Sequence, residues 1–199
     1  VTASYPETHG ICSNFWFDPE LGEGTYVESG KDILDETTFQ RARKLDRTSI
    51  LVTSKDKLRT LLGDGATFVV SSEQPPDWGV SGVGPSPDIY SLEVNGWVIR
   101  AASYVMSRQP SDLVYITTTD YAMHTYGPGD GESQRHISIL DGAIGRLVEA
   151  HPDVTLLVTA DHGMSRKTRM VDLGAVLTGH GIASTPVPII KDRYVVHHS

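Results

Sequence analysis

The sequence predicts an α/β fold in which a central, mostly parallel sheet is flanked by helices. Residues 113–119 and 154–160 are short apolar runs with β-branched residues, and residues 132–150 between them place apolar side chains at helical spacing. A strand, a crossover helix and a second strand in this order form a βαβ unit, in which the strands lie parallel. Strands of this kind are usually buried on both faces of the sheet.

The chain before these runs is less regular. Residues 1–30 are rich in Gly, Pro and aromatic residues, which indicates short irregular strands and turns without a helix. Residues 37–45 are predicted as a short helix, and residues 49–53 as a strand because of their β-branched content. We expect residues 1–199 to belong to one domain, in which residues 1–35 form an irregular cap or edge region.

A second helix is predicted directly after the strand at 49–53. Ser54 is expected to cap this helix, which covers residues 55–62 and ends at Gly63. Residues 66–70 are predicted as the next strand. Residues 71–87 hold several prolines and glycines and are predicted as a loop.

The most regular half of the sequence follows that loop. Asp88 is expected to cap a long helix that runs to about Arg108, with apolar residues at roughly helical spacing. The predicted strand at 113–119, the amphipathic helix at 132–150 and the strand at 154–160 complete the chain of expected elements.

Composition excludes several classes of protein. The net charge of −8 argues against a nucleic-acid-binding surface, which normally carries a basic patch. No apolar run approaches the roughly 18–20 residues that a membrane span needs. The single Cys12 cannot form an intramolecular disulfide. With no signal-peptide pattern at the start, these features favour a cytoplasmic protein.

Two carboxylate–imidazole pairs follow the two apolar runs: Asp120 with His124, and Asp161 with His162. Ligands of open parallel sheets gather at the carboxyl ends of the strands, where both pairs are expected. A spacing of four residues puts Asp120 and His124 on one side of a helical turn. Oxygen and imidazole donors together suit zinc, or manganese and iron, better than calcium. The alternative is that Asp161 caps a helix and His162 is an ordinary surface residue.

Two lysines, Lys55 and Lys57, fall in the first turn of the helix predicted after the strand at 49–53. Cations are mildly unfavourable at a helix N-terminus, so this placement indicates a functional role, although a solvated helical turn is the alternative. The other histidines, His136, His151 and His180, are expected to be surface or capping residues. Cys12 is expected to be a small buried apolar residue.

Several motifs carry a family resemblance. Residues 120–128 and 159–164 resemble the two central metal motifs of the alkaline phosphatase superfamily, and in particular its phosphodiesterase and nucleotide pyrophosphatase branch. Residues 9–15, 52–62 and 194–198 extend this resemblance to the phosphonoacetate hydrolases of that branch. The resemblance implies an alkaline-phosphatase-like sheet that is incomplete at both ends of this chain.

The resemblance also implies a site with two zinc ions. Residues Asp120 and His124 would hold one ion together with a late histidine. Residues Asp161 and His162 would hold the other together with an early aspartate and a threonine nucleophile. By this resemblance, the early aspartate and the nucleophile precede Val1 and the late histidine follows the chain.

Nearby residues are not assigned to these roles. Thr2 and Thr8 lie too close to Asn14 to match the nucleophile, and His197 and His198 match a segment upstream of the late histidine. We therefore expect the chain by itself to be inactive.

The substrate residues that the resemblance implies are Asn14, Lys55 and Lys57. Asn14 would donate to a phosphoryl oxygen, and the two lysines would hold the carboxylate of a small anionic organophosphonate. Hydrolysis of the C–P bond of phosphonoacetate would then yield acetate and phosphate.

Two alternatives stay open. A phosphodiesterase or nucleotide pyrophosphatase would keep Asn14 and both metal pairs without needing the lysines, and an inactive metal-binding module would need no nucleophile. A homodimer is a further expectation.

Overall fold

The computed structural model of the protein describes residues 1–166, 168–169 and 171–184. Its centre is a parallel sheet with the strand order β4-β3-β5, formed by β3 (Ser49–Thr53), β4 (Phe68–Ser71) and β5 (Leu113–Thr117). All three strands run in the same direction, and the predicted α/β class with a parallel sheet flanked by helices is confirmed. The predicted strand at 49–53 has the observed bounds.

The central strand β3 is buried on both faces, because successive side chains point to opposite sides of a sheet. Ile50 and Val52 pack against Trp97 and its neighbours on one side. Leu51 packs against Phe39 on the other side. The sheet therefore has two apolar faces, and each is covered by its own helices.

Helices α2 (Thr38–Lys44) and α3 (Asp56–Leu62) cover the face that contains Leu51. The predicted helix at 37–45 forms as α2, and Thr37 caps it in a reciprocal pair of hydrogen bonds with Gln40. Ser54 does not cap α3 as expected. It is buried, and Lys55 occupies the N-cap position instead.

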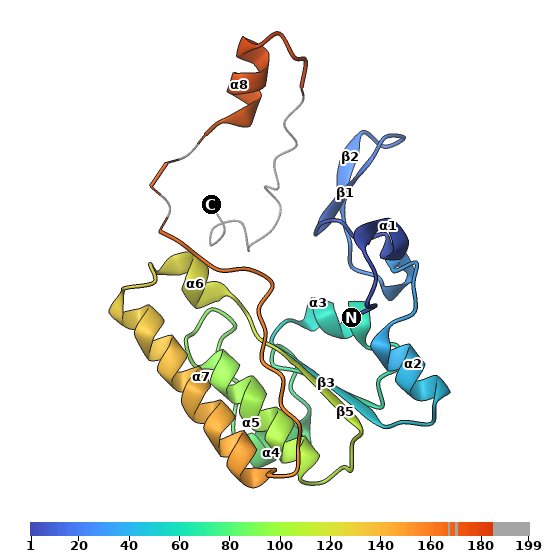
Figure 1. Ribbon diagram of the computed structural model, residues 1–199, viewed down its shortest axis with the longest axis vertical. Coiled ribbons are helices and arrows are strands. Elements are labelled where there is room, and N and C mark those ends of the chain that lie inside the picture. The colour runs from blue at the N-terminus through green and yellow to red at the C-terminus, as the bar shows by residue number, and fades with distance from the viewer. Residues whose placement is uncertain (167, 170, 185–199) are drawn as a thin grey trace.

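Helix α5 (Val94–Met106) covers the opposite face, and α7 (Gly131–Ala150) packs on α5 from outside. Figure 1 shows these two long helices side by side. Ile99 of α5 meets Ala143 and Leu147 of α7, so the predicted amphipathic helix buries an apolar stripe, although Ile137 and Val148 of the expected apolar face are exposed.

The segment before α5 departs from prediction. Residues 71–87 contain a helix, α4 (Asp77–Val83), in which Trp78 stacks on Tyr104 of α5 with ring centroids 6.0 Å apart. Asp88 does not begin the long helix, because its Oδ1 accepts from the backbone N–H of Tyr90 at 2.7 Å and closes a turn. Tertiary packing and local turn chemistry thus override the sequence pattern here.

The N-terminal residues form a one-turn helix α1 (Pro6–His9), an antiparallel hairpin of β1 (Phe15–Asp18) and β2 (Glu23–Tyr26), and a 3-10 turn η1 (Gly30–Asp32). Short strands and turns are confirmed, whereas the exclusion of any helix was wrong by one turn. The hairpin stands apart from the parallel sheet in Figure 1. Cys12 is exposed, contrary to the prediction that it is buried.

The predicted strand at 154–160 does not form. Leu157 is 89% exposed and Val158 is 70% exposed, and among the described strands β5 pairs only with β3. A strand needs a neighbour for its backbone N–H and C=O groups, and this segment has none in the part of the chain that the structure describes. The predicted βαβ unit therefore lacks its second strand.

Two shorter helices complete the described chain, α6 (Tyr121–Thr125) and α8 (Leu173–Gly179). None of the helices in the described ranges has the length and apolar character needed to span a membrane.

Candidate functional site

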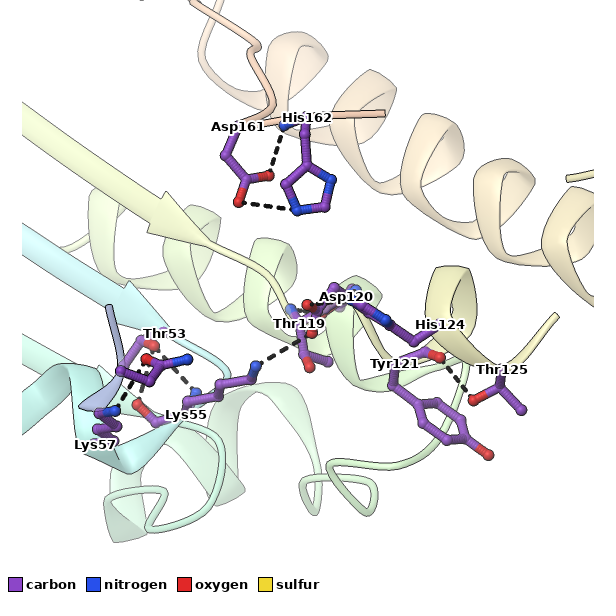
Figure 2. A network of polar contacts seen from close by, with 12 residues as sticks. Thr53, Lys55, Lys57, Thr119, Asp120, Tyr121, His124, Thr125, Asp161 and His162 are labelled. Atoms are coloured by element: carbon purple, nitrogen blue, oxygen red, sulfur yellow. Dashed lines mark hydrogen bonds and ion pairs between the residues drawn. The ribbon is translucent and has the colours of Figure 1, made fainter. Parts of the chain in front are cut away.

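The carboxyl ends of β3 and β5 lie side by side, because the two strands are parallel neighbours paired up to Thr53 and Thr117. The chain that leaves β3 carries Lys55 and Lys57, and the chain that leaves β5 carries Asp120. Thr53 fixes the first of these exits: its Oγ1 accepts from the backbone N–H of Lys55 and donates to the carbonyl of Lys55, both at 3.1 Å. Figure 2 shows this arrangement.

The first carboxylate–imidazole pair is formed as the sequence predicts. Asp120 is the N-cap of α6, and His124 lies one helical turn later. His124 Nε2 lies 3.0 Å from Asp120 Oδ2, and the backbone N–H of His124 donates to the carbonyl of Asp120 at 3.1 Å. The short helix thus presents a carboxylate oxygen and an imidazole nitrogen to the same point.

Lys55 reaches this pair from β3. Its Nζ lies 3.2 Å from Asp120 Oδ1, in a half-buried position. Burial raises the pKa of Asp120, but the charge and hydrogen bond of Lys55, with a smaller contribution from His124, lower it further than burial raises it. The pKa of Asp120 therefore lies below its ordinary value, and the carboxylate is held ionised.

Lys57 contacts Asn14, which is also a predicted substrate residue. Its Nζ donates to Asn14 Oδ1 at 3.1 Å and lies 5.6 Å from the ring centroid of Tyr26. Asn14 directly precedes β1, so this contact joins the N-terminal hairpin to the exit of β3. The hydrogen bond uses the amide oxygen of Asn14 and so directs its Nδ2 donors elsewhere.

The second carboxylate–imidazole pair is more exposed. His162 Nε2 lies 3.6 Å from Asp161 Oδ2, and Asp161 is 88% exposed. A hydrogen bond from His162 Nδ1 to the carbonyl of Gly163, at 3.0 Å, raises the pKa of His162, and the charges of Asp161 and Asp120 raise it further. Figure 2 shows both pairs, with the second carried by the segment that forms no strand.

In each pair the imidazole nitrogen and the carboxylate oxygen lie at ion-pair distance, which also permits both atoms to bind one ion. With zinc–ligand bonds of about 2.1 Å, two ligand atoms on a tetrahedral ion lie about 3.4 Å apart. The measured 3.0 Å and 3.6 Å lie on either side of that value. Among the described residues, however, no three His, Cys, Asp or Glu side chains converge on one point. The structure therefore brings each pair together, and in the described part of the chain no third side chain of these types joins either pair.

Sequence reasoning missed a buried polar cluster beneath this site. Asn95 of α5 and His136 of α7 are 1% and 2% exposed, and Asn95 holds the backbone of Thr119. His136 is thus neither a surface nor a capping residue, contrary to prediction. An asparagine flanked by Val94, Gly96 and Trp97 in an apolar helix was the signal that could have located this cluster.

Part of the family resemblance falls outside the described part of the chain. His197 and His198, and the segment 194–198 that contributed to the resemblance, lie outside the described residues.

The sequence of the chain matches a known protein family and several curated proteins. Residues 1–195 match the model of the family described as type I phosphodiesterase / nucleotide pyrophosphatase. The chain is 28% identical over 182 residues to human ectonucleotide pyrophosphatase/phosphodiesterase family member 1, covering 83% of this chain and 18% of that protein. It is 25% identical over 170 residues to the venom phosphodiesterase of Naja atra, covering 82% and 20%.

Two solved structures are also similar. They are phosphonoacetate hydrolase from Sinorhizobium meliloti 1021 in complex with phosphonoformate and with phosphonoacetate, each with a TM-score of 0.67 and 31% identity. The match covers 74% of this chain and 40% of those chains. The chain thus spans about a fifth of these curated relatives and 40% of the structural neighbours.

Proposed function

The chain belongs to the type I phosphodiesterase / nucleotide pyrophosphatase family, a family of hydrolases, and we propose that its parent protein is a dinuclear zinc hydrolase that cleaves phosphonoacetate to acetate and phosphate. One observation carries the substrate assignment. Lys55 and Lys57 leave the same strand and reach the two other parts of the site, Asp120 and Asn14. Positive charge at both places suits a substrate with an anionic group at each end.

In this proposal, the metal ligands of the chain are the two carboxylate–imidazole pairs. Asp120 and His124 hold one zinc ion, and Asp161 and His162 hold the other. Zinc at these positions supplies Lewis-acid stabilisation of an attacking oxygen and of phosphoryl charge. The threonine nucleophile is contributed by a part of the parent protein outside this chain, as the resemblance implies.

Asn14 has the role of a hydrogen-bond donor to the phosphoryl group. Since Lys57 binds its amide oxygen, the Nδ2 donors are oriented away from that lysine. A fixed amide donor aimed at a developing negative charge lowers the energy of the transition state more than a mobile one. Lys57 is thus both a charge for the substrate and a support for Asn14.

Lys55 has the role of carboxylate binder, with a dependence on metal. In the structure its ammonium is held by Asp120. If Asp120 held a metal ion, its carboxylate would be shared with that ion, and the Lys55 ammonium would be placed to bind the carboxylate of the substrate. Metal binding at Asp120 and the affinity for an anionic substrate would be coupled in this way.

A second candidate is a phosphodiesterase or nucleotide pyrophosphatase. The matching family and the curated relatives carry these names, and both metal pairs and Asn14 serve a diester equally well. Such an enzyme does not require Lys55 or Lys57. A third candidate, an inactive metal-binding module, differs from both because it has no nucleophile.

The deciding experiment compares Lys55→Ala and Lys57→Ala in the zinc-loaded full-length parent protein, with Lys31→Ala on the exposed turn η1 as a control. Loss of a charge-assisted hydrogen bond should lower kcat/KM for phosphonoacetate by about 10- to 100-fold, and the control should stay within about two-fold. A nitrophenyl diester as the better substrate, with the lysine variants unchanged, would favour the diesterase. Fewer than one bound zinc per chain would refute both enzymes.

A further inference from the structure

A fully buried side-chain amide, that of Asn95, lies beneath Asp120 and His124, the proposed ligands of the first zinc ion. Asn95 is 1% exposed in the first turn of α5, between Val94 and Trp97, which are fully buried. A buried amide destabilises the folded state if its hydrogen bonds are not made, because burial removes its hydrogen bonds to water. An apolar residue would pack in this core without that requirement, so packing alone does not account for an asparagine at this position.

Asn95 forms two hydrogen bonds with one backbone unit. Its Nδ2 donates to the carbonyl of Thr119 at 2.7 Å, and its Oδ1 accepts from the N–H of Thr119 at 2.8 Å. A neighbouring strand would present the same donor and acceptor. The amide thus substitutes for a strand partner two residues after β5 ends, where the backbone has left the sheet.

A histidine fixes the orientation of that amide. His136 Nδ1 lies 3.2 Å from the carbonyl of Leu92, which can only accept, so Nδ1 carries the proton and Nε2 is an acceptor. Nε2 lies 3.3 Å from Asn95 Nδ2 and takes its second N–H. A flipped amide would face Thr119 and His136 with the wrong groups. Burial lowers the pKa of His136, which agrees with this neutral form.

The clamped residue directly precedes Asp120. The carbonyl of Asp120 accepts from the N–H groups of Met123 and His124, so the position of Asp120 sets where α6 begins. A shift of Thr119 would therefore move both the carboxylate and the imidazole of the proposed first zinc pair. The clamp acts on two ligands through a single backbone unit.

We propose that Asn95, oriented by His136, is a positioning residue that holds the Asp120–His124 pair in its metal-binding geometry by clamping the backbone of Thr119. This inference rests on the proposed function, since it assigns a role toward the same zinc ion. Both side chains act on the Asp120–His124 pair through the backbone of Thr119. Residues that support metal ligands in this way typically change metal affinity by about 10- to 100-fold when they are replaced.

The test uses the full-length parent protein and three variants. Asn95→Ala removes both bonds to Thr119, and His136→Gln leaves those bonds but removes the ring that orients the amide. Ser103→Ala is the matched control, because Ser103 lies on the same helix and its Oγ pairs with His151 Nε2 at 3.1 Å. The measurements are zinc affinity by chelator competition, the visible absorption of the cobalt-substituted protein, and the urea midpoint.

Asn95→Ala should weaken binding of one of the two zinc ions by about 10- to 100-fold and change the cobalt spectrum. His136→Gln should change both in the same direction by less, which keeps the test decisive if Asn95→Ala fails to fold. Ser103→Ala should lower the urea midpoint without either change. Affinity and spectrum unchanged in the Asn95 and His136 variants would overturn the clamp alone. A wild-type protein that binds no zinc would overturn the proposed function and the clamp together.

Discussion

The two Asp–His pairs follow apolar runs of the same kind, yet only one run is a strand. Residues 113–117 pair with β3, whereas residues 154–160 have no strand partner in the described chain. Asp120 lies half-buried between Lys55 and His124, and Asp161 is exposed. An apolar run that ends in Asp therefore does not decide whether that carboxylate is held in place, and the backbone beside the run does.

The largest expected difference between the two regions is in how strongly their backbone amide hydrogens are protected from exchange with solvent. Amide hydrogens of β5 that bond to β3 should exchange only on global or near-global unfolding, while those of residues 154–160 should exchange at nearly free rates. With a stability of about 5 kcal/mol, this is a difference of about 1,000-fold or more. Hydrogen exchange followed by mass spectrometry measures it. Equal protection of the two segments would remove the contrast.

Side-chain truncation should separate the regions by a smaller amount. Leu51 is 0% exposed and Leu157 is 89% exposed, so the same substitution can be made in each. Leu51→Ala should cost about 2–5 kcal/mol in the free energy of unfolding, because it leaves a cavity in the core. Leu157→Ala should stay within about 0.5 kcal/mol. Urea denaturation of both variants gives the comparison, and a large loss from Leu157→Ala would mean that residues 154–160 are packed in solution.

The pKa values of two histidines should depart from the ordinary value in opposite directions: that of His136, in the buried cluster that holds Thr119, and that of His162, in the exposed second pair. Burial lowers the pKa of His136 below 6.5, and the contact with Gly163 raises that of His162 above 6.5. As pH falls through the ordinary histidine range, unfolded His136 binds a proton before the folded form does, so its effect is to lower stability in acid. The small stabilisation from exposed His162 is present in acid and is lost as pH rises. NMR titration of the ring protons checks the order of the two pKa values; the reverse order would contradict it.

The smallest effect expected is that of Lys55 on the carboxylate beside it. Lys55→Ala should raise the pKa of Asp120, because burial remains while the opposing charge is removed. The stabilisation that Asp120 contributes is present above its unfolded pKa and is lost as pH falls through its folded value. In the variant this stabilisation should be smaller, and its loss should be complete at a higher pH. Carboxyl NMR measures the shift, with Lys57→Ala as the control. An unchanged Asp120 would mean that the ion pair contributes little in solution.

The elements that were predicted correctly are those whose signals are local. Residues 49–53 contain three β-branched residues, and Thr37 with Gln40 forms a complete capping box, so both signals lie within the local sequence. The Asp120–His124 pair belongs to this group, because its geometry follows from one helical turn. The class of fold was predicted from the apolar runs at 113–119 and 154–160 and the helical periodicity of 132–150, and it is confirmed although the second run forms no strand in the described structure.

The features that could not be predicted depend on partners far away in sequence. Trp78 stabilises α4 through Tyr104, and residues 154–160 form no strand because no strand lies beside them in the described structure. The cluster of Asn95, Thr119 and His136 joins three segments that no periodicity connects. The pairing of Lys55 with Asp120 depended on β3 and β5 being neighbours, which the sequence pattern did not specify.

The outer side of β5 has a consequence for handling the protein. In the described sheet this strand has β3 on one side only, and the exposed side chains of Leu157 and Val158 belong to the segment predicted to extend the sheet. An uncovered strand edge is a template for pairing with other chains, and apolar side chains beside it favour aggregation. Expressed by itself, the chain would face self-association as a competing reaction, with the rate rising with concentration. Solubility of the chain would then depend on this open edge.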